Sequence, residues 1–290
     1  MARFAVFLLW LLHFLPFRWL VALGEGLGAL LYRVGGERRR VALTNLRLCF
    51  PQRTEAEREM LAKRNFQMFA RSFLERSLLW WSKPARINRL IRVEGLEHFD
   101  TAVKNGPVIM LAPHFVALDV AGAWIAQHYN CSSMYSEQKN PVFNALLLRG
   151  RLRFGDQKLF SRHDGLRPLV RVIRDGYPFY YLPDQDLGTK DGIFVPFFGV
   201  QAATLTTVAR LAKVTGAKLV PCIARMLPDA QGYEVRFYPP WDNYPCDDIE
   251  TDTRRVNAFI EERVLEIPEQ YFWLHKRFKT RPEGEKGFYE

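Results

Sequence analysis

From about residue 92 onward, the chain alternates between strand-like and helix-like segments, and this pattern constrains the fold more than any other feature. The first strand candidate, residues 108–112, is a short apolar run that follows Asn105-Gly106-Pro107, so it is predicted to be buried. Such an alternation is typical of an α/β fold whose mixed, largely parallel sheet is flanked by helices. Further strands are predicted at residues 131–135, 179–182, 219–224 and, as an edge strand, 233–238; helices are predicted at residues 116–128, 142–151, 166–175, 205–215 and 253–265.

A long amphipathic helix is predicted ahead of this region, from Glu55 to Trp81. Thr54 and Glu57 have the spacing of a capping box, in which each side chain bonds the backbone of the other residue. The sequence Lys83-Pro84 ends the helix. Its apolar stripe, which we expect to pack on the main domain, contains Phe66, Phe69, Phe73 and Trp80.

The first forty residues contain the most apolar stretch. Residues 4–17 carry no formal charge, and a helix that spans a membrane needs roughly 20 apolar residues. The stretch reaches that length only if His13, Pro16 and Arg18 are tolerated, so the segment either spans the bilayer or lies in its interface. A cleaved signal peptide ending near residues 21–24 is the alternative, but the basic cluster at residues 38–40 favours retention on the cytoplasmic side.

The predicted organisation is therefore an N-terminal hydrophobic membrane-anchor helix within residues 1–34, followed by a catalytic domain at residues 35–290. Residues 35–90 form its helical lead-in, and residues 91–290 form the α/β core.

Composition narrows the range of partners. The formal net charge of +10 favours anionic partners such as lipid headgroups, phosphorylated lipids or acidic carrier proteins. Nucleic acid is not expected, since zinc-finger spacing, basic heptads and an aromatic RNA-binding signature are missing from the sequence. The four cysteines are widely separated and form no CxxC pair, which is typical of a reducing compartment.

The first candidate for chemistry is the block from His114 to Asp119, directly after the buried strand. Residues five apart on one helix point roughly 140° away from each other, so the two side chains can meet only if His114 lies in the strand-to-helix turn. A carboxylate bonded to one imidazole nitrogen leaves the other nitrogen free as a general base. Because no Gly-x-Ser-x-Gly elbow is present, the proton would come from a substrate hydroxyl, and no acyl-enzyme would form. A surface histidine near an unrelated acid remains the alternative.

A second candidate is the segment from Arg149 to Gly155. Its three guanidinium groups, on alternate positions at Arg149, Arg151 and Arg153, stand beside glycines and could form a phosphate clamp. Arg162 and His163 would add to it if the fold brings them near. A solvated basic helix end is the alternative reading.

The third candidate is Asp184 with Asp186, two acids that follow a strand and could hold a divalent metal or orient neighbouring groups. The apolar loop after them, with Phe198, Gly199 and Thr204, could line a slot for an acyl chain. Ordinary loop packing explains this loop equally well.

Taken together, these segments resemble the bacterial lipid A biosynthesis acyltransferases of the lauroyl/myristoyl type, within the lysophospholipid acyltransferase superfamily. The resemblance covers nearly the whole chain. It is carried by the N-terminal apolar segment, Asn45-Leu46, Phe50-Pro51, the His114-x4-Asp119 block, Arg149-Gly150-Arg151, Pro183-Asp184-Gln185-Asp186, Phe197-Phe198-Gly199, Ala202-Ala203-Thr204 and Val220-Pro221.

The resemblance implies that His114 and Asp119 are a catalytic dyad and that Arg149 and Arg151 bind the acceptor, a phosphorylated glucosamine disaccharide lipid. It implies acyl carrier protein as the donor of the fatty acyl chain, and the inner membrane of a bacterial cell, on its cytoplasmic face, as the location. We also expect Asp184, Asp186, Phe198, Gly199 and Thr204 to contact substrate. Neither a cofactor nor a metal is expected.

Three other functions remain open at this stage. Relatives with this architecture acylate other glycolipids, including mannosylated phosphatidylinositol. A metal-dependent glycosyltransferase would use Asp184 and Asp186, and a non-catalytic membrane adaptor would bind acidic partners through residues 149–153.

Overall fold

The computed structural model describes residues 2–161 and 164–289, so Arg162 and His163 lie outside the described residues. Its main sheet has the strand order β1-β9-β8-β2-β5-β3-β4, and within the described residues β8 and β9 form its one antiparallel pair. This confirms the predicted mixed, largely parallel sheet. The strands are β1 (Ile91–Glu94), β2 (Val108–Leu111), β3 (Ser132–Tyr135), β4 (Lys158–Ser161), β5 (Phe179–Tyr181), β8 (Lys218–Met226) and β9 (Tyr233–Phe237).

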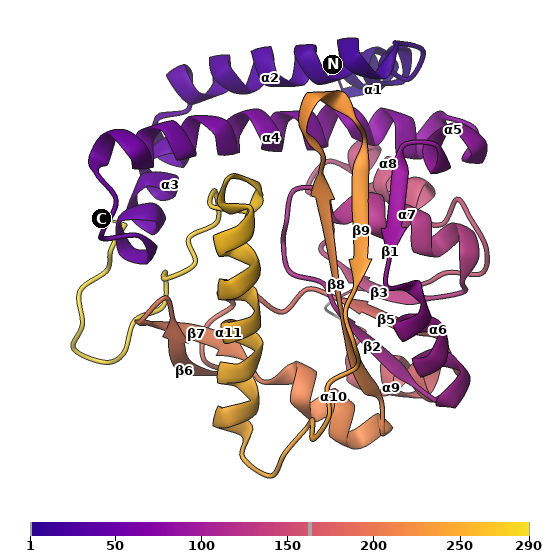
Figure 1. The fold of residues 1–290 in the computed structure, drawn as a ribbon, viewed down its shortest axis with the longest axis vertical. Helices are drawn as coiled ribbons and strands as arrows, with labels where there is room; N and C mark the ends of the chain where they lie inside the picture. The colour runs from indigo at the N-terminus through magenta and orange to yellow at the C-terminus, as the bar shows by residue number, and fades with distance from the viewer. Residues whose placement is uncertain (1, 162–163, 290) are drawn as a thin grey trace.

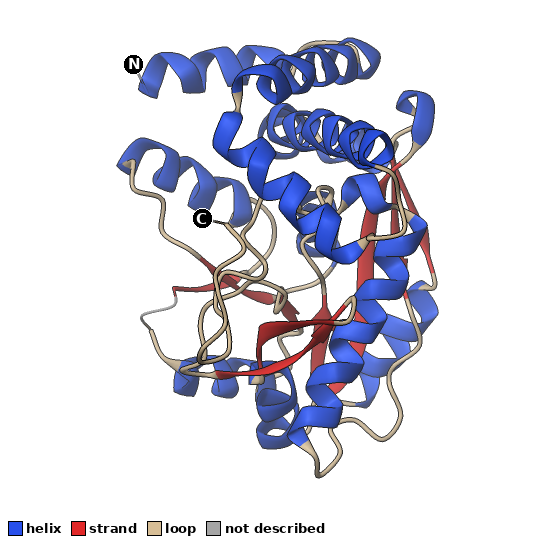
Figure 2. Cartoon of the chain, turned by 90° about the vertical axis from the view of Figure 1, so that its left-hand side faces the viewer, coloured by secondary structure: helices blue, strands red, loops and turns tan. Residues whose placement is uncertain are grey.

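Helices cover both faces of this sheet, as Figure 1 and Figure 2 show. In the central strand β2, Ile109 and Leu111 pack in one hydrophobic cluster, while Val108 and Met110 pack in the other. Successive strand residues point to opposite faces, so this near-continuous apolar run fits a strand that is buried on both sides. The first cluster includes residues of α9 (Leu166–Arg174), α10 (Thr207–Thr215) and α11 (Ile249–Glu266), and the second includes residues of α6 (Leu96–Asn105) and α7 (Leu118–His128).

The long helix α4 (Glu55–Trp81) has the bounds that the sequence predicts. The backbone N–H of Thr54 donates to the Glu57 carboxylate at 2.7 Å, and the backbone N–H of Glu57 donates to the Thr54 hydroxyl at 3.3 Å, so the predicted capping box is confirmed. The short helix α5 (Pro84–Asn88) follows it. Helix α3 (Gly36–Cys49) precedes it, and α8 (Pro141–Arg151) lies near its C-terminal end.

The prediction of one continuous N-terminal anchor helix is wrong. The segment forms two helices, α1 (Ala2–Leu12) and α2 (Phe17–Val34), and Pro16, which has no N–H to donate, stands at the break. Helix α2 lies along α4 (Figure 1), and a Cβ atom at Gly28 would stand only 2.3 Å from the Cα of Gln67, so only glycine permits this approach. Among the residues described, no helix combines the length and apolar character needed to cross a membrane.

Other segments also differ from prediction. The predicted apolar loop is a hairpin of β6 (Gly192–Phe197) and β7 (Val200–Leu205), joined by Phe198 and Gly199 at φ values of 49° and 79°. Positive φ at both positions is the requirement of a two-residue turn of type I′. In addition, β9 is not an edge strand, because β1 pairs with its outer side. Strand β1 was not predicted, although Ile91-Arg92-Val93-Glu94 alternates apolar and charged residues as a half-buried strand does.

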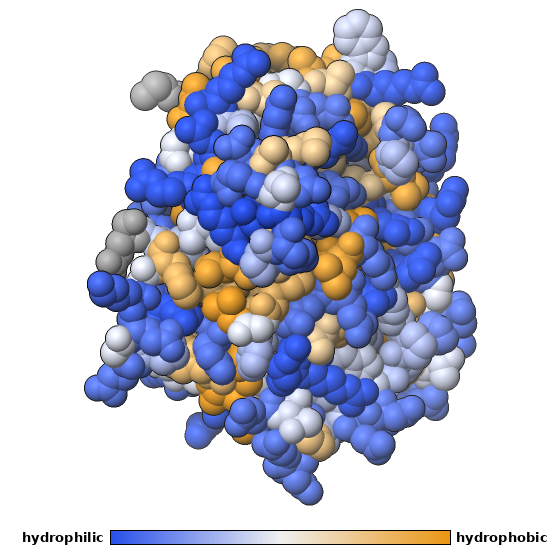
Figure 3. Space-filling model, turned by 60° about the vertical axis from the view of Figure 1, so that its left-hand side comes forward, coloured by the Kyte–Doolittle hydropathy of each residue, from blue (hydrophilic) through white to orange (hydrophobic). Residues whose placement is uncertain are grey.

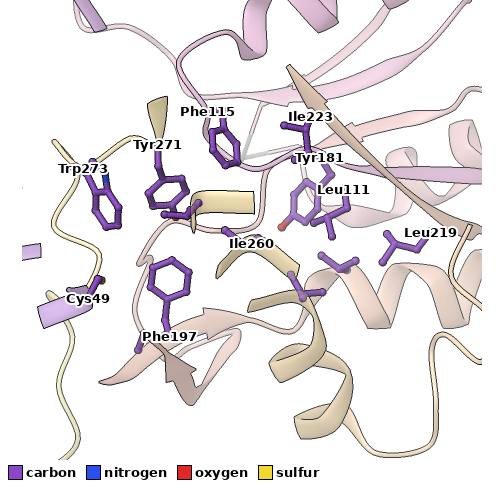
Figure 4. Packing of buried hydrophobic residues seen from close by; sticks show 14 of the residues in the cluster. Cys49, Leu111, Phe115, Tyr181, Phe197, Leu219, Ile223, Ile260, Tyr271 and Trp273 are labelled. Atoms are coloured by element: carbon purple, nitrogen blue, oxygen red, sulfur yellow. The ribbon is translucent and has the colours of Figure 1, made fainter. Parts of the chain in front are cut away.

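The segment from Pro268 to Phe278 packs against the end of β2. It begins with a single 3-10 turn, η2 (Pro268–Gln270), and Phe272 donates its N–H to the carbonyl of His114 at 3.0 Å. Two buried asparagines hold this segment: Asn65 donates to the carbonyls of residues 269 and 271 at 2.8 and 2.6 Å, and Asn45 donates to those of residues 273 and 275 at 2.7 and 2.8 Å. Figure 4 shows Tyr271 and Trp273 of this segment among the buried side chains near Phe115.

Replacing Asn65 by leucine should lower the free energy of unfolding by about 2–3 kcal/mol, because two carbonyls lose a buried donor. Urea unfolding measures the change. Asn105→Leu is the matched control, since the Asn105 side chain is exposed at the end of α6, and we expect a change within about 0.5 kcal/mol there. Equal losses in the two variants would contradict the assigned role of Asn65.

Candidate active site

The candidate site lies where two neighbouring parallel strands end. Leu111, the last residue of β2, is in register with Tyr181, the last residue of β5. His114 and Asp184 each stand three residues beyond these partners, so the two chains bring them to the same edge of the sheet. The Nδ1 atom of His114 lies 2.7 Å from Oδ1 of Asp184, and the backbone N–H of His114 lies 3.2 and 3.0 Å from the two carboxylate oxygens.

The charge of Asp184 determines the tautomer of the imidazole. Burial raises the pKa of Asp184, but the His114 ring, the His114 backbone N–H and the Tyr271 hydroxyl outweigh this effect and lower the pKa to about 2. An ionised carboxylate can only accept, so the proton of the neutral imidazole lies on Nδ1 and the lone pair on Nε2. The His114 side chain is 19% exposed, and within the described residues no protein group bonds Nε2, so this nitrogen can accept a proton from a bound molecule.

Asp119 does not hold the His114 ring. Its carboxylate accepts from Nε of Arg76 on α4 at 2.6 Å and lies 3.6 Å from Nη2 of Arg151 on α8, while in the described part of the chain no hydrogen bond or ion pair joins it to His114. The predicted direct contact of the dyad is therefore wrong. Asp119 lies in the first turn of α7, which carries its side chain towards α4 and α8. Burial raises the pKa of Asp119, but the charges of Arg76 and Arg151, the hydrogen bond from Arg76 and, as the smallest cause, the charge of His114 outweigh it and lower the pKa.

The arginines of residues 149–153 do not lie together in the way that the predicted clamp requires. Positions two apart on a helix differ by about 200°, so Arg149 and Arg151 point to different sides of α8. Arg149 is exposed, whereas Arg151 reaches Asp119. Arg153 is used structurally, since its guanidinium donates to the carbonyls of Leu79 and Ser82.

The acids of the Pro-Asp-Gln-Asp segment have separate partners. Asp186 is buried and accepts from the backbone N–H of Gly188 at 3.0 Å and from the N–H and hydroxyl of Thr280 at 2.6 and 2.8 Å. It therefore fixes the loop rather than facing the space beside His114. Among the described residues no cluster of three or more histidine, cysteine or acidic side chains could hold a metal ion.

Phe198, Gly199 and Thr204 have structural roles in the fold, and their contact with substrate stays a prediction. Phe198 and Gly199 make the hairpin turn, and the ring of Phe198 packs 5.2 Å from that of Phe50. The buried Thr204 hydroxyl donates to the carbonyl of Ala202 and accepts from Asn257 and Arg277, which uses its full hydrogen-bonding capacity.

Sequence reasoning missed the residues that the C-terminal segment adds to the site. A small pocket beside His114 is lined by Asn45, Asp184, Gln185, Tyr271, Phe272, Trp273, His275 and Arg277. Burial lowers the pKa of His275 to about 4, so its neutral ring accepts the backbone N–H of Asp186 at 3.0 Å. The aromatic run at residues 271–273 was the one signal for this segment in the sequence.

A second, larger pocket opens beside Asp119, between α7, the end of α4, α8 and the strands β3, β4 and β5. Its cavity volume is about 60 Å³. Its lining is mostly apolar, and Asp119 and Arg151 stand among its lining residues.

Comparison with known proteins identifies the family of the chain. Residues 1–280 match the family model of the bacterial lipid A biosynthesis acyltransferases. The lipid A biosynthesis lauroyltransferase of Escherichia coli is 36% identical over 278 residues, which cover 95% of this chain and 90% of the relative. The myristoyltransferase of the same organism is 38% identical over 261 residues (89% and 80%), and its palmitoleoyltransferase is 32% identical over 288 residues (99% and 93%). The chain therefore belongs to the bacterial lipid A biosynthesis acyltransferase family and is an acyltransferase.

Proposed function

We propose that the protein transfers a fatty acyl chain from acyl carrier protein to a hydroxyl of a phosphorylated lipid A precursor, with His114 as the general base. The observation that carries this proposal is the hydrogen bond from His114 Nδ1 to the buried carboxylate of Asp184, which leaves Nε2 as the acceptor. In this role Asp184 is a positioning residue, and Asp119 serves a different purpose.

The reaction is a direct transfer. Nε2 of His114 takes the proton of the acceptor hydroxyl as its oxygen attacks the thioester carbonyl, and a tetrahedral intermediate forms. The carbon–sulfur bond then breaks, and the imidazolium returns the proton to the departing sulfur. The products are the ester and the free thiol of the carrier, and His114 is neutral again. Asp184 stabilises the imidazolium between the two proton transfers.

Three of the four cysteines are poorly suited to form an acyl-enzyme. Cys131 lines the apolar pocket, and its burial raises the pKa of its thiol to about 12. Burial also raises the pKa of Cys49 and of Cys222. The thiolate is the nucleophilic form, so these three thiols remain unreactive near neutral pH.

Asp119 acts in this proposal through the two arginines that it holds. Arg76 and Arg151 converge on one carboxylate, so two positive charges share one negative charge beside the mouth of the pocket. The remaining positive charge suits a phosphate of the acceptor or of the carrier's prosthetic arm. Loss of Asp119 should therefore disturb substrate binding more than the basicity of His114.

Attachment to the cytoplasmic face of a bacterial inner membrane is the second part of the proposal. In residues 2–34, large apolar side chains remain exposed on α1, α2 and the turn between them: Phe4, Phe7, Leu8, Leu11, Phe14, Trp19, Leu23, Leu30, Leu31 and Val34. Figure 3 shows hydrophobic side chains at the top of the molecule, where Figure 1 places α1 and α2. Arg33 and residues 38–40 add positive charge nearby, so we propose a bilayer interface with anionic lipid as the surface that covers these helices.

The glycosyltransferase alternative loses its basis, since Asp184 and Asp186 bind different protein groups rather than converging on one ion. Acylation of another glycolipid uses the same chemistry and is an outcome of the assay below.

The catalytic proposal predicts that His114→Ala and Asp184→Asn each lower kcat by about two to four orders of magnitude, because one removes the base and the other its orienting charge. The assay follows ester formation by mass spectrometry, with acyl carrier protein thioesters as donors and lipid A precursors or a mannosylated phosphatidylinositol as acceptors.

Asp119→Asn is the matched comparison. We expect it to raise KM for the substrate more than it lowers kcat, because its partners are Arg76 and Arg151. The proposal would be wrong if Asp119→Asn lost most of its kcat while Asp184→Asn stayed nearly active. Asp119 would then be the residue that orients His114. Thermal unfolding of each variant checks that the fold is intact.

The membrane proposal predicts that the protein floats with vesicles that contain anionic phospholipid. Changing Phe4 and Trp19 together to glutamate should weaken this binding by about tenfold or more, because two large apolar side chains no longer enter the interface. Val214→Glu is the control: Val214 is 52% exposed, comparable with 64% for Phe4 and 67% for Trp19, but it belongs to α10 at the opposite end of the molecule in Figure 1. Equal binding by the double variant would exclude these helices as the membrane surface.

A further inference from the structure

The small pocket beside His114 has room for a single substrate atom rather than for a chain. Its volume is about 10 Å³, which is close to the least space that holds one water molecule. Asp184, Gln185 and His275 are among its polar lining residues. During the transfer proposed above, the thioester carbonyl must lie within about 3–3.5 Å of the attacking oxygen, which is bound to Nε2 of His114. We therefore expect the carbonyl oxygen to lie near this pocket.

That oxygen becomes an anion in the tetrahedral intermediate, so it needs hydrogen-bond donors that are already in place. Most side-chain donors of the pocket lining are used within the protein. Asn45 and Trp273 donate to backbone carbonyls, and the Tyr271 hydroxyl bonds the nearby carboxylate of Asp184. Both terminal nitrogens of Arg277 donate to β7. Its Nε has no partner among the residues described, but this atom is buried and cannot reach a bound molecule.

His275 keeps one donor free, and its ring is held in place. Its Nε2 accepts the backbone N–H of Asp186 at 3.0 Å, so the proton of the neutral ring lies on Nδ1. In the described part of the chain no acceptor bonds this Nδ1–H. Burial, followed by the charge of His114, lowers the pKa of His275 to about 4. The ring therefore stays a neutral donor when His114 becomes positively charged during the reaction.

We propose that His275 is a catalytic residue that donates its Nδ1–H to the carbonyl oxygen of the thioester and stabilises the oxyanion of the tetrahedral intermediate. The inference rests on the acyl transfer proposed above. The hydrogen bond strengthens as the acceptor oxygen attacks and negative charge collects on the carbonyl oxygen. It weakens when the carbon–sulfur bond breaks and the carbonyl forms again. His275 keeps its proton throughout, and His114 alone moves the proton of the hydroxyl.

Gln185 is the other donor to consider in this pocket. Within residues 2–161 and 164–289 its carboxamide has no protein partner, so nothing fixes its orientation. The His275 ring, in contrast, is fixed by a backbone N–H. A donor that is fixed before the reaction needs no reorganisation while charge develops, so His275 suits the role better.

The test uses the full-length enzyme with carrier-protein thioesters. His275→Leu should lower kcat by about 10²–10³-fold with little change in KM, because it removes a donor that acts mainly on the intermediate. His275→Gln should recover most of this loss, since a carboxamide can both accept the Asp186 N–H and donate to the carbonyl oxygen. A second measurement is the binding of carrier protein that bears an acyl thioether, in which a methylene replaces the carbonyl. His275→Leu should bind it as tightly as the wild type does, because the thioether has no oxygen to receive the N–H.

His128→Leu is the matched control, because Nδ1 of His128 lies 2.8 Å from the carbonyl of Trp124 and the ring lines neither described pocket. Its kcat should equal that of the wild type. An unchanged kcat in His275→Leu, a large loss of thioether binding there, or a greater loss of kcat in Gln185→Leu would overturn the inference.

Absence of transfer by the wild type from every thioester would instead refute the proposed function. If His275→Leu does not fold, Nδ1-methylhistidine at the same position decides the question. It keeps the acceptor for the backbone N–H of Asp186 and removes only the donor, so the same loss of kcat is expected.

Discussion

The site depends on the adjacency of β2 and β5. Parallel neighbours end at the same edge of a sheet, so residues at equal distance beyond their last paired positions meet there. His114 and Asp184 meet in this way, although 70 residues separate them in the sequence. The hydrogen bond between them fixes the ring, and the backbone N–H of His114 fixes the carboxylate in turn. The base therefore has the rigidity of the central strands rather than that of a surface loop.

This dependence explains what the sequence could and could not reveal about the site. The apolar run at residues 108–112 and the following proline placed His114 correctly at the end of a buried strand. Its acidic partner was not predictable in the same way, because the positions of predicted strands along the sequence do not reveal the order of the strands in the sheet. Asp119 was favoured because it is close in sequence, but helix α7 turns it towards Arg76 and Arg151.

The same distinction holds for the fold. Local sequence signals were sufficient where the residues of one element determine its bounds: the capping box at Thr54 and the proline after Lys83 predicted both ends of α4. They failed where contacts with other elements determine the structure. Hydrophobicity alone could not distinguish one anchor helix from two shorter helices that pack along α4, and strand β1, with its charged residues, is specified by its pairing with β9. Helical periodicity could have separated Arg149 from Arg151, since positions two apart do not share a face.

The packing of residues 268–278 behind His114 has a consequence for the time at which the protein can first act. Asn45 and Asn65, on helices that are synthesised early, donate to carbonyl groups of residues 268–278, which are synthesised much later. The hydroxyl of Tyr271, in the same late segment, bonds the carboxylate of Asp184. A ribosome delivers those residues more than 150 positions after the histidine itself. A nascent chain therefore carries an unfinished catalytic centre until these residues have been synthesised, and the enzyme becomes competent only after that point.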